Sequence, residues 1–249
     1  MSEYEPSTYG DRIADAYDAW HQLPTDTDQT VEFLASLAGS GLVLELGIGT
    51  GRIALPLAAR GLAVHGIDAS DAMVARLRSK THGDQIPVTM GDFAEVNTPD
   101  TYKLVYVVFN TFFALLTQED QVRCMRNVAA HLSDGGVFVL EAFVPDLTRF
   151  NQRQRVAATH VGLDEVVLDV SVHRPETQRI DIQAVVIRGG EIKTYPVPIR
   201  YAWPSELDLM AQLAGLRLRE RWGGWSREPY EGVGKHVSIY EHARDYSNS

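Results

Sequence analysis

The sequence predicts an α/β protein with a mostly parallel, seven-stranded sheet, helices on both faces, an N-terminal helical lid and an inserted antiparallel β meander. Three observations carry this prediction. Between residues 42 and 142, short apolar runs alternate with amphipathic stretches. The runs are apolar at nearly every position, which indicates strands buried on both faces. After Pro145 the pattern becomes β-rich and is interrupted by turn residues.

Length and composition indicate one globular unit. The chain has 249 residues, of which 45% are hydrophobic and 22% charged, the balance of an ordinary folded protein. No apolar stretch approaches the ~18 residues of a membrane span. The first residues, Met1–Pro6, lack the basic and apolar regions of a signal peptide. We therefore expect a cytoplasmic protein with no membrane partner.

The net charge argues against nucleic-acid binding, and the cysteine content excludes an intrachain disulfide. The formal net charge is −10 and the basic residues are scattered, whereas nucleic-acid binding draws on a positive face. We therefore expect no nucleic-acid partner. The single cysteine, Cys124, excludes an intrachain disulfide, and its helical spacing from Val122 and Met125 predicts a packed thiol rather than a nucleophile.

Residues 1–40 form the predicted helical lid. Tyr9, Ile13 and Tyr17 recur at helical spacing, and a second helical pattern over 31–37 follows a break at 24–26. Residues 41–145 form the predicted core. Its strands are expected at 42–46, 63–67, 86–90, 104–109 and 137–142, and its helices at 52–60, 70–80 and 117–132.

Residues 146–203 form the predicted insertion, a meander with strands at 165–173, 179–187 and 191–201. It is either a flap over a binding pocket or the surface of a homodimer. Residues 204–243 return to the main sheet. A helix opens at Pro204 and ends before Gly215, and the last two strands are expected at 216–222 and 235–241.

The most informative segment is the glycine-rich stretch 43–52. A buried strand leads directly into Gly47, Gly49 and Gly51, and a helix follows. Glycine lets the backbone turn sharply and lets a ligand approach the main chain closely. The helix N-terminus favours a negative group such as a carboxylate. By itself this pattern is also compatible with a plain strand–helix turn.

Two acids at neighbouring strand ends strengthen the prediction of a site. Asp68 ends the second strand and Asp92 follows the third. In doubly wound sheets this edge binds ligands, and an acid there accepts ribose hydroxyls. A dinucleotide fingerprint would place a third glycine where Arg52 stands. Glu45, Gly51 and Asp92 also argue against a nicotinamide dinucleotide.

These motifs resemble those of class I S-adenosylmethionine (SAM)-dependent methyltransferases. The matching segments are 45–52, 66–73, 91–93 and 109–112, and the resemblance covers roughly residues 40–145. The flanking regions resemble the small-molecule branch, which includes enzymes that methylate amino sugars and polyketide-type products. The resemblance implies a Rossmann-like sheet, SAM as cofactor, and methyl transfer to an oxygen or nitrogen of a small molecule.

The resemblance also implies cofactor-binding roles for individual residues. Gly47, Gly49 and Gly51 would face the methionyl part, and Glu45 would order the loop or the amino group. The remaining positions implied are Asp68 and Ala69 at the ribose, Met73, Asp92 and Phe93 at the adenine, Phe109 and Asn110 near the sulfonium, and Tyr9, Tyr17 or Arg52 at the carboxylate.

Methyl transfer is a direct in-line displacement that requires no metal, and we expect none because the sequence has no metal-ligand spacing. An acceptor that must lose a proton would need a general base. Glu141 at the end of the fifth strand, His236 after a glycine-rich loop, and Tyr17 are the leading candidates, with His21 and His160 behind them.

Two alternatives remain open from sequence alone. One is a SAM-binding relative that does not methylate, either a regulator or a cyclase. The other is an NAD(P)-dependent oxidoreductase, which shares the nucleotide-binding half of the fold.

Overall fold

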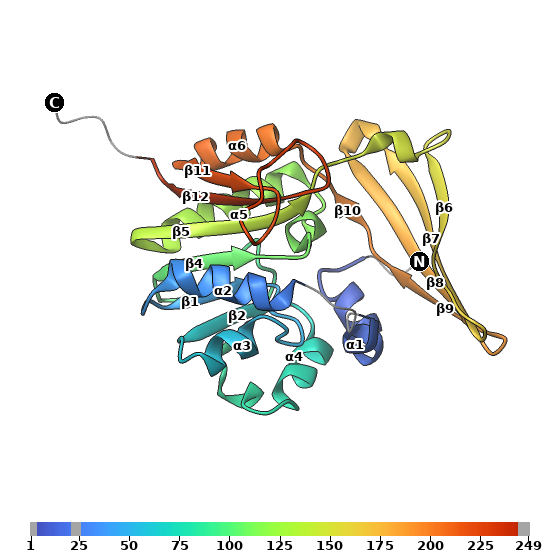
Figure 1. Ribbon diagram of the computed structural model, residues 1–249, viewed down its shortest axis with the longest axis horizontal. Helices are drawn as coiled ribbons and strands as arrows, with labels where there is room; N and C mark the ends of the chain where they lie inside the picture. The colour runs from blue at the N-terminus through green and yellow to red at the C-terminus, as the bar shows by residue number, and fades with distance from the viewer. Residues whose placement is uncertain (1–3, 21–25, 244–249) are drawn as a thin grey trace.

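The computed structural model describes residues 4–20 and 26–243. Its centre is a seven-stranded sheet in the order β11-β12-β5-β4-β1-β2-β3 (Figure 1). β1 to β5 are parallel, whereas β12 and β11 are antiparallel to their neighbours. The predicted α/β architecture is therefore confirmed. The strands are β1 (Val43–Leu46), β2 (Val64–Asp68), β3 (Val88–Met90), β4 (Tyr102–Val107), β5 (Leu132–Phe143), β11 (Leu216–Trp222) and β12 (Lys235–His242).

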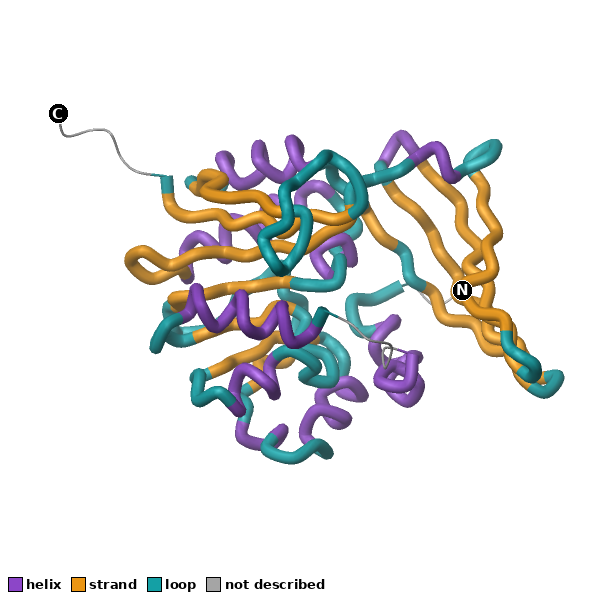
Figure 2. Tube along the Cα trace, in the orientation of Figure 1, coloured by secondary structure: helices purple, strands orange, loops and turns teal. Residues whose placement is uncertain are grey.

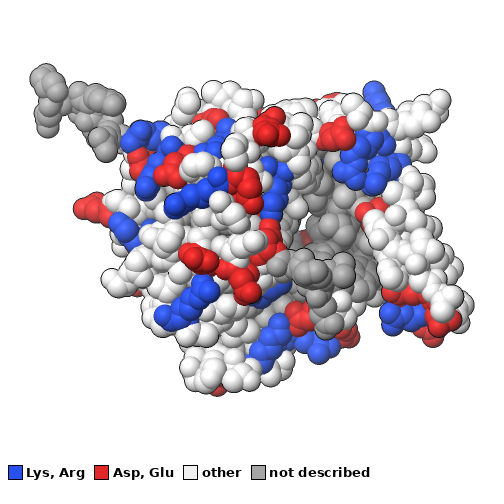
Figure 3. Space-filling model, viewed as in Figure 1, with Lys and Arg blue, Asp and Glu red and all other residues white. Residues whose placement is uncertain are grey.

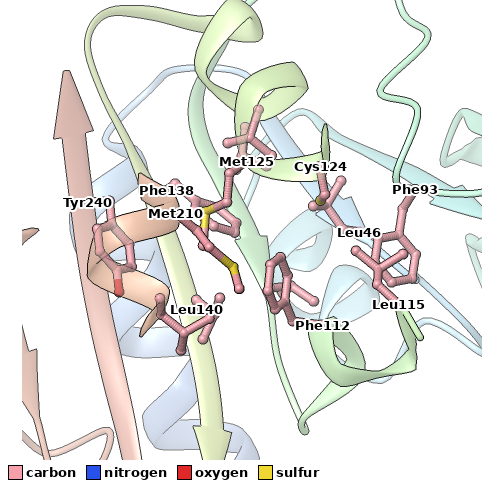
Figure 4. Packing of buried hydrophobic residues seen from close by; sticks show 14 of the residues in the cluster. Leu46, Phe93, Phe112, Leu115, Cys124, Met125, Phe138, Leu140, Met210 and Tyr240 are labelled. Atoms are coloured by element: carbon pink, nitrogen blue, oxygen red, sulfur yellow. The ribbon is translucent and has the colours of Figure 1, made fainter. Parts of the chain in front are cut away.

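Successive residues of a strand point to opposite faces of the sheet. Both faces of this sheet are apolar, and helices cover each of them. Leu44 packs beneath α5 (Gln118–His131) and α6 (Pro204–Leu213), and Val43 packs beneath α2 (Thr27–Ala38) and α3 (Ala54–Ala59). Figure 4 shows the first of these cores, in which Cys124 lies among apolar side chains. Cys124 is fully buried in this core, so the expectation of a packed thiol is confirmed, and burial raises the pKa of the thiol.

The two N-terminal helices have different positions. α1 (Thr8–Trp20) lies apart from the sheet, between the first strand tips and the second sheet (Figure 2). It packs Ile13 and Ala14 against Met73 of α4 (Asp71–Arg78). α2 instead belongs to the main core, because Leu34 and its apolar neighbours are buried against the sheet. The segment in the position of a lid is therefore α1 and not the whole of 1–40.

The insertion forms a second, antiparallel sheet with strands β6 (Gln154–Val161), β7 (Glu165–Arg174), β8 (Arg179–Arg188), β9 (Glu191–Pro196) and β10 (Ile199–Arg200). β6 is absent from the sequence prediction, because its mixture of alanine, Arg155 and His160 lacks an apolar alternation. The predicted strand 191–201 is divided into β9 and β10, with Val197 and Pro198 between them.

A buried polar junction joins the two sheets. Arg200 has a side chain that is only 5% exposed, and it pairs with Glu206 of α6 at 2.8 Å. The same guanidinium donates to Gln121 Oε1 of α5 at 2.6 Å. Gln121 in turn donates to the main-chain oxygen of Arg200 at 2.9 Å. The second sheet is therefore fixed to the helices of the main core by hydrogen bonds that are sheltered from water.

Within residues 4–20 and 26–243, no helix combines the length and apolar character needed to cross a bilayer. Over the same ranges, His, Cys, Asp and Glu side chains form no group of three suited to a metal ion. On the face shown in Figure 3, acidic and basic side chains are interspersed over the main body.

Candidate functional site

A cavity of about 560 Å³ opens at the carboxyl edge of the main sheet, within the ~300–1,000 Å³ typical of small-molecule sites. Its walls come from the strand tips, from α1 and from the second sheet. It brings together most of the residues implied by the sequence: Tyr9, Tyr17, Gly47, Gly49, Asp68, Ala69, Met73, Asp92, Phe93, Phe109 and Asn110.

The glycine loop forms the floor of this cavity, and its glycines have different tasks. Gly47, Gly49 and Gly51 all have positive φ, a conformation that favours glycine. A Cβ on Gly47 would lie 2.6 Å from Thr111 Cγ2, and one on Gly51 would lie 2.3 Å from Leu77 Cδ1. A Cβ on Gly49 would meet no atom closer than 4.0 Å. Gly51 therefore serves packing, whereas Gly49 leaves space open above the loop.

Asp68 is held by the backbone around it. Its Oδ2 accepts from Gly49 N at 2.7 Å, and its Oδ1 accepts from Ser70 N at 2.8 Å. Burial raises the pKa of Asp68, and the backbone donors oppose that rise. Because a carboxylate offers about four lone-pair sites, acceptor capacity remains on the side that lines the cavity. Asp92, one strand further out, accepts from Ala94 N at 2.9 Å through Oδ1.

Helix α1 closes the cavity from the side opposite the strand tips. Asp11 accepts from Ser70 Oγ at 2.6 Å, and Asp18 accepts from Thr50 Oγ1 at 2.6 Å. Asp18 also pairs with Lys80 Nζ at 2.8 Å. These contacts place Tyr9 and Tyr17 in the cavity wall, where burial raises the pKa of both hydroxyls.

The chain leaves β4 through two consecutive left-handed residues, Phe109 (φ 54°) and Asn110 (φ 63°). Such conformations are strained for non-glycine residues and persist only where surrounding contacts hold them. Phe109 N donates to Glu141 Oε2 at 2.9 Å, and Phe143 N donates to Asn110 Oδ1 at 2.7 Å. Two contacts from the end of β5 therefore hold this turn at the cavity.

Three residues implied by the resemblance lie behind the lining rather than in it: Glu45, Gly51 and Arg52. The Arg52 guanidinium stacks 3.2 Å from the centre of the Phe109 ring. Its Nε is buried and has no hydrogen-bond partner. Glu45 is 4% exposed and accepts from Tyr106 Oη at 2.8 Å. Burial raises the pKa of Glu45 to about 8.

Glu141 does not line the cavity, contrary to its expected role as a general base. Besides Phe109 N, it accepts from Trp225 Nε1 at 3.1 Å and from Lys235 Nζ at 3.1 Å. These donors occupy the carboxylate. Glu141 therefore holds the turn after β4 together with the loop that leads into β12.

His236 also lies outside the lining, in a fully buried position. Its Nδ1 is 2.8 Å from Ser238 Oγ, and burial lowers its pKa to about 4. The loop before it returns to the core, where Trp225 packs edge-on against Phe33 of α2. His160 is exposed on β6, and His21 lies outside the described residues. Of the leading base candidates, only Tyr17 reaches the cavity.

Much of the remaining lining was not predicted. Tyr4, Thr111 and Asp120 line the cavity, and so do Ile182 and Ile199 of the second sheet. The latter two are apolar residues in strands, and no sequence motif distinguishes them from core positions. Tyr4 belongs to the same N-terminal tyrosine series as Tyr9 and Tyr17, which is a signal that could have identified it.

Comparisons with known proteins agree with this geometry. The methyltransferase-domain family matches residues 43–136. The structure of the CcbJ methyltransferase from Streptomyces caelestis is 38% identical, covers 97% of this chain and 100% of its own, and superposes with a TM-score of 0.92. The cypemycin N-terminal methyltransferase of Streptomyces sp. is 29% identical over 240 residues, which is 94% of this chain and 97% of that protein.

A third relative matches over a shorter span. The dTDP-4-amino-2,3,4,6-tetradeoxy-D-glucose N,N-dimethyltransferase of Saccharopolyspora spinosa is 28% identical over 141 residues, covering 54% of this chain and 56% of that protein. A full-length match at 38% identity on a shared fold decides between the nucleotide-binding alternatives. The chain belongs to the class I SAM-dependent methyltransferases.

Proposed function

We propose that this protein methylates an amine nitrogen of a small molecule. The observation that carries the choice of nitrogen is the absence of a general base in the wall: the described lining residues include no histidine, lysine or glutamate. The names of two relatives, the cypemycin N-terminal methyltransferase and the amino-sugar N,N-dimethyltransferase, agree with an amine acceptor.

The residues present fit SAM. Gly49 leaves open space above a positive-φ turn, which suits the methionyl part of the cofactor. Asp68 retains acceptor capacity for two ribose hydroxyls. The buried, unpartnered Nε of Arg52 suits the carboxylate, with Tyr17 nearby. Glu45, close behind the loop, suits the amino group.

The outer part of the cofactor site suits an adenine ring. Met73 and Phe93 offer buried apolar surfaces, and Asp92 offers a carboxylate oxygen to an exocyclic amine. The two strained residues after β4, Phe109 and Asn110, would lie near the sulfonium through their main chain.

When bound, SAM supplies an electrophilic methyl group on a positively charged sulfur. The protein would contribute by positioning the acceptor against that methyl group and by excluding water from the site. Such positioning alone is worth up to ~7–11 kcal/mol of the barrier. Aromatic faces and main-chain carbonyls in the wall also suit a cationic centre.

An amine suits this wall because its lone pair is available without help from the protein. The carboxylates of Asp68 and Asp92 are assigned to the cofactor, and Asp120 pairs with Arg123 at 2.6 Å. Burial raises the pKa of Tyr4 to about 12 and raises those of Tyr9 and Tyr17 as well, so these hydroxyls remain protonated near neutral pH. Burial of the acceptor lowers the pKa of its own ammonium form and keeps it neutral.

The test uses acceptor pairs that differ only in carrying an amine or a hydroxyl at the same carbon. Transfer of a radiolabelled methyl group from SAM is measured from pH 6 to pH 9. We expect the amines to be methylated and the alcohols not, with a rate that rises through the pKa of each amine. Methylation of the alcohols, or a pH midpoint that is the same for amines of different pKa, would contradict the proposal. Binding of SAM without transfer to any acceptor would favour the non-methylating alternative.

A further inference from the structure

We infer that the acceptor half of the cavity takes an amine with an apolar, phosphate-free body, and that it rejects acceptors linked to a nucleotide diphosphate. This inference rests on the proposed transfer to nitrogen and extends it to the chemical class of the whole acceptor. It rests on which residues form one wall of the cavity and on the partners of the arginines close to that wall.

The wall in question lies beyond the strand tips. Ile182 of β8 and the segment 197–199 face the cavity from the second sheet. Val197 N donates to Ile182 O at 2.8 Å, so β8 and the segment 197–199 form one continuous surface. Leu115 and Phe143 complete it from the main domain. Apolar side chains therefore face the space that the cofactor residues do not claim.

The lining of the cavity has acidic side chains but no basic ones among the described residues. Among the described residues that line it, there is no lysine or arginine, whereas Asp68, Asp92 and Asp120 are present. A diphosphate entering such a space would lose its hydration without gaining a cationic partner, which is strongly unfavourable. It would also lie near carboxylates of like charge. A neutral amine with an apolar body meets neither penalty.

Of the cations close to the cavity, Arg52 is assigned to the cofactor, and three others have an acidic partner or face solvent. Arg179 and Arg12 lie close enough to Tyr4 to oppose the rise in its pKa. Arg179 donates to Asp181 Oδ1 at 3.0 Å through Nη2, and its buried Nε has no hydrogen-bond partner. Arg12 is exposed on α1. Arg123 beside Asp120 is also bound at 2.6 Å by Glu95.

One relative with a partial match names an acceptor of the excluded class. The dTDP-amino-sugar N,N-dimethyltransferase matches only 54% of this chain, and by its name it acts on an acceptor that carries a diphosphate. The second sheet, which supplies Ile182 and 197–199, stands outside the region of the methyltransferase-domain match at 43–136.

The first experiment compares two forms of one 4-amino sugar: its dTDP conjugate and its octyl glycoside, with benzylamine and phenethylamine as further apolar amines. We expect kcat/KM for at least one apolar amine to exceed that for the dTDP conjugate at least tenfold. An equal or higher value for the dTDP conjugate would overturn the inference while leaving nitrogen methylation intact. Transfer to none of these amines, in protein that binds S-adenosylhomocysteine, would also overturn it. Failure of the proposed function would be recognised by a different result, namely methylation of the acceptors that carry a hydroxyl in place of the amine.

The second experiment places a charge on the wall. Ile199→Lys is compared with Ile192→Lys, a control on β9 where the side chain is 67% exposed. We expect Ile199→Lys to lower kcat/KM for the best apolar amine at least tenfold, with S-adenosylhomocysteine affinity unchanged within twofold. That affinity shows that the variant has folded. If Ile199→Lys methylates the apolar amine as well as Ile192→Lys does, the assignment of this wall is wrong.

Discussion

Glu45 gives the sharpest prediction because its chemistry can be followed through stability without any substrate. The side chain is buried at the end of β1 and accepts from Tyr106 Oη at 2.8 Å. Burial raises its pKa from 4.5 to about 8, and the Tyr106 hydrogen bond opposes that rise. At ~1.4 kcal/mol per pH unit, the ionised form is penalised by about 5 kcal/mol in the folded state.

The sign follows from proton linkage. Between pH 4.5 and about 8, the native state holds a proton on Glu45 that the unfolded chain has released. The free energy of unfolding therefore falls as pH rises through this window, by up to ~1.4 kcal/mol per pH unit. Glu45→Gln removes the titration while keeping an amide oxygen for Tyr106. The stability of the variant relative to the parent should therefore increase by about 3 kcal/mol between pH 5.5 and pH 7.5.

Urea unfolding at pH 5.5, 6.5 and 7.5 measures this difference, followed by tryptophan fluorescence and circular dichroism. Comparing variant with parent cancels every other titrating group. The matched control is Glu32→Gln, which removes an exposed carboxylate on α2 and should track the parent at each pH. A constant gap between Glu45→Gln and the parent would refute the assignment of a protonated, buried Glu45.

Three further predictions concern the site. In the proposed binding mode, Asp68→Ala removes two charge-assisted hydrogen bonds to the ribose, about 3 kcal/mol, and should weaken S-adenosylhomocysteine binding roughly 100-fold by calorimetry; an affinity matching that of the exposed control Asp71→Ala would contradict it. His236 has a pKa lowered to about 4, so the parent should lose up to ~3 kcal/mol of stability as pH falls from 6.5 to 4. His236→Gln should lack that loss and keep the pH profile of methyl transfer, and an altered transfer profile would restore His236 as a base. Glu141→Ala leaves Phe109 N and other buried donors unpaired and should lower Tm by roughly 5–10 °C; an unchanged Tm in thermal-shift assays would remove its positioning role.

The main sheet was predictable because each signal was local. Apolar runs mark the buried strands, and the helix limits agree with the structure to within a few residues at α4 and α5. β6 was missed because an edge strand that is largely exposed has little need for apolar alternation. α2 was assigned to the lid because helical spacing does not reveal which surface a helix packs against.

The candidate site divides in the same way. Gly49, Asp68 and Asp92 were predictable because the order of strands fixes where strand tips meet. The positions of Glu141 and His236 were not, because pairing in the sheet brings a residue to the correct edge without turning its side chain toward the ligand. His236 pairs with Ala142 in register, yet its ring is buried behind the cavity. Ile182 and Ile199 were beyond prediction because their role depends on how two sheets approach each other.

The anchoring of α1 has a consequence for turnover. Its acids at positions 11, 15 and 18 meet Ser70, Arg76 and Lys80 along one helical stripe, while its buried apolar contact is confined to a few residues. Exposed ion pairs contribute only ~0.2–1 kcal/mol each and weaken as salt rises. Water and ions can replace these ion pairs, so they add little to the free energy needed to displace the helix. Displacement of this helix would give a spent cofactor an exit that does not require the β-sheet scaffold to deform.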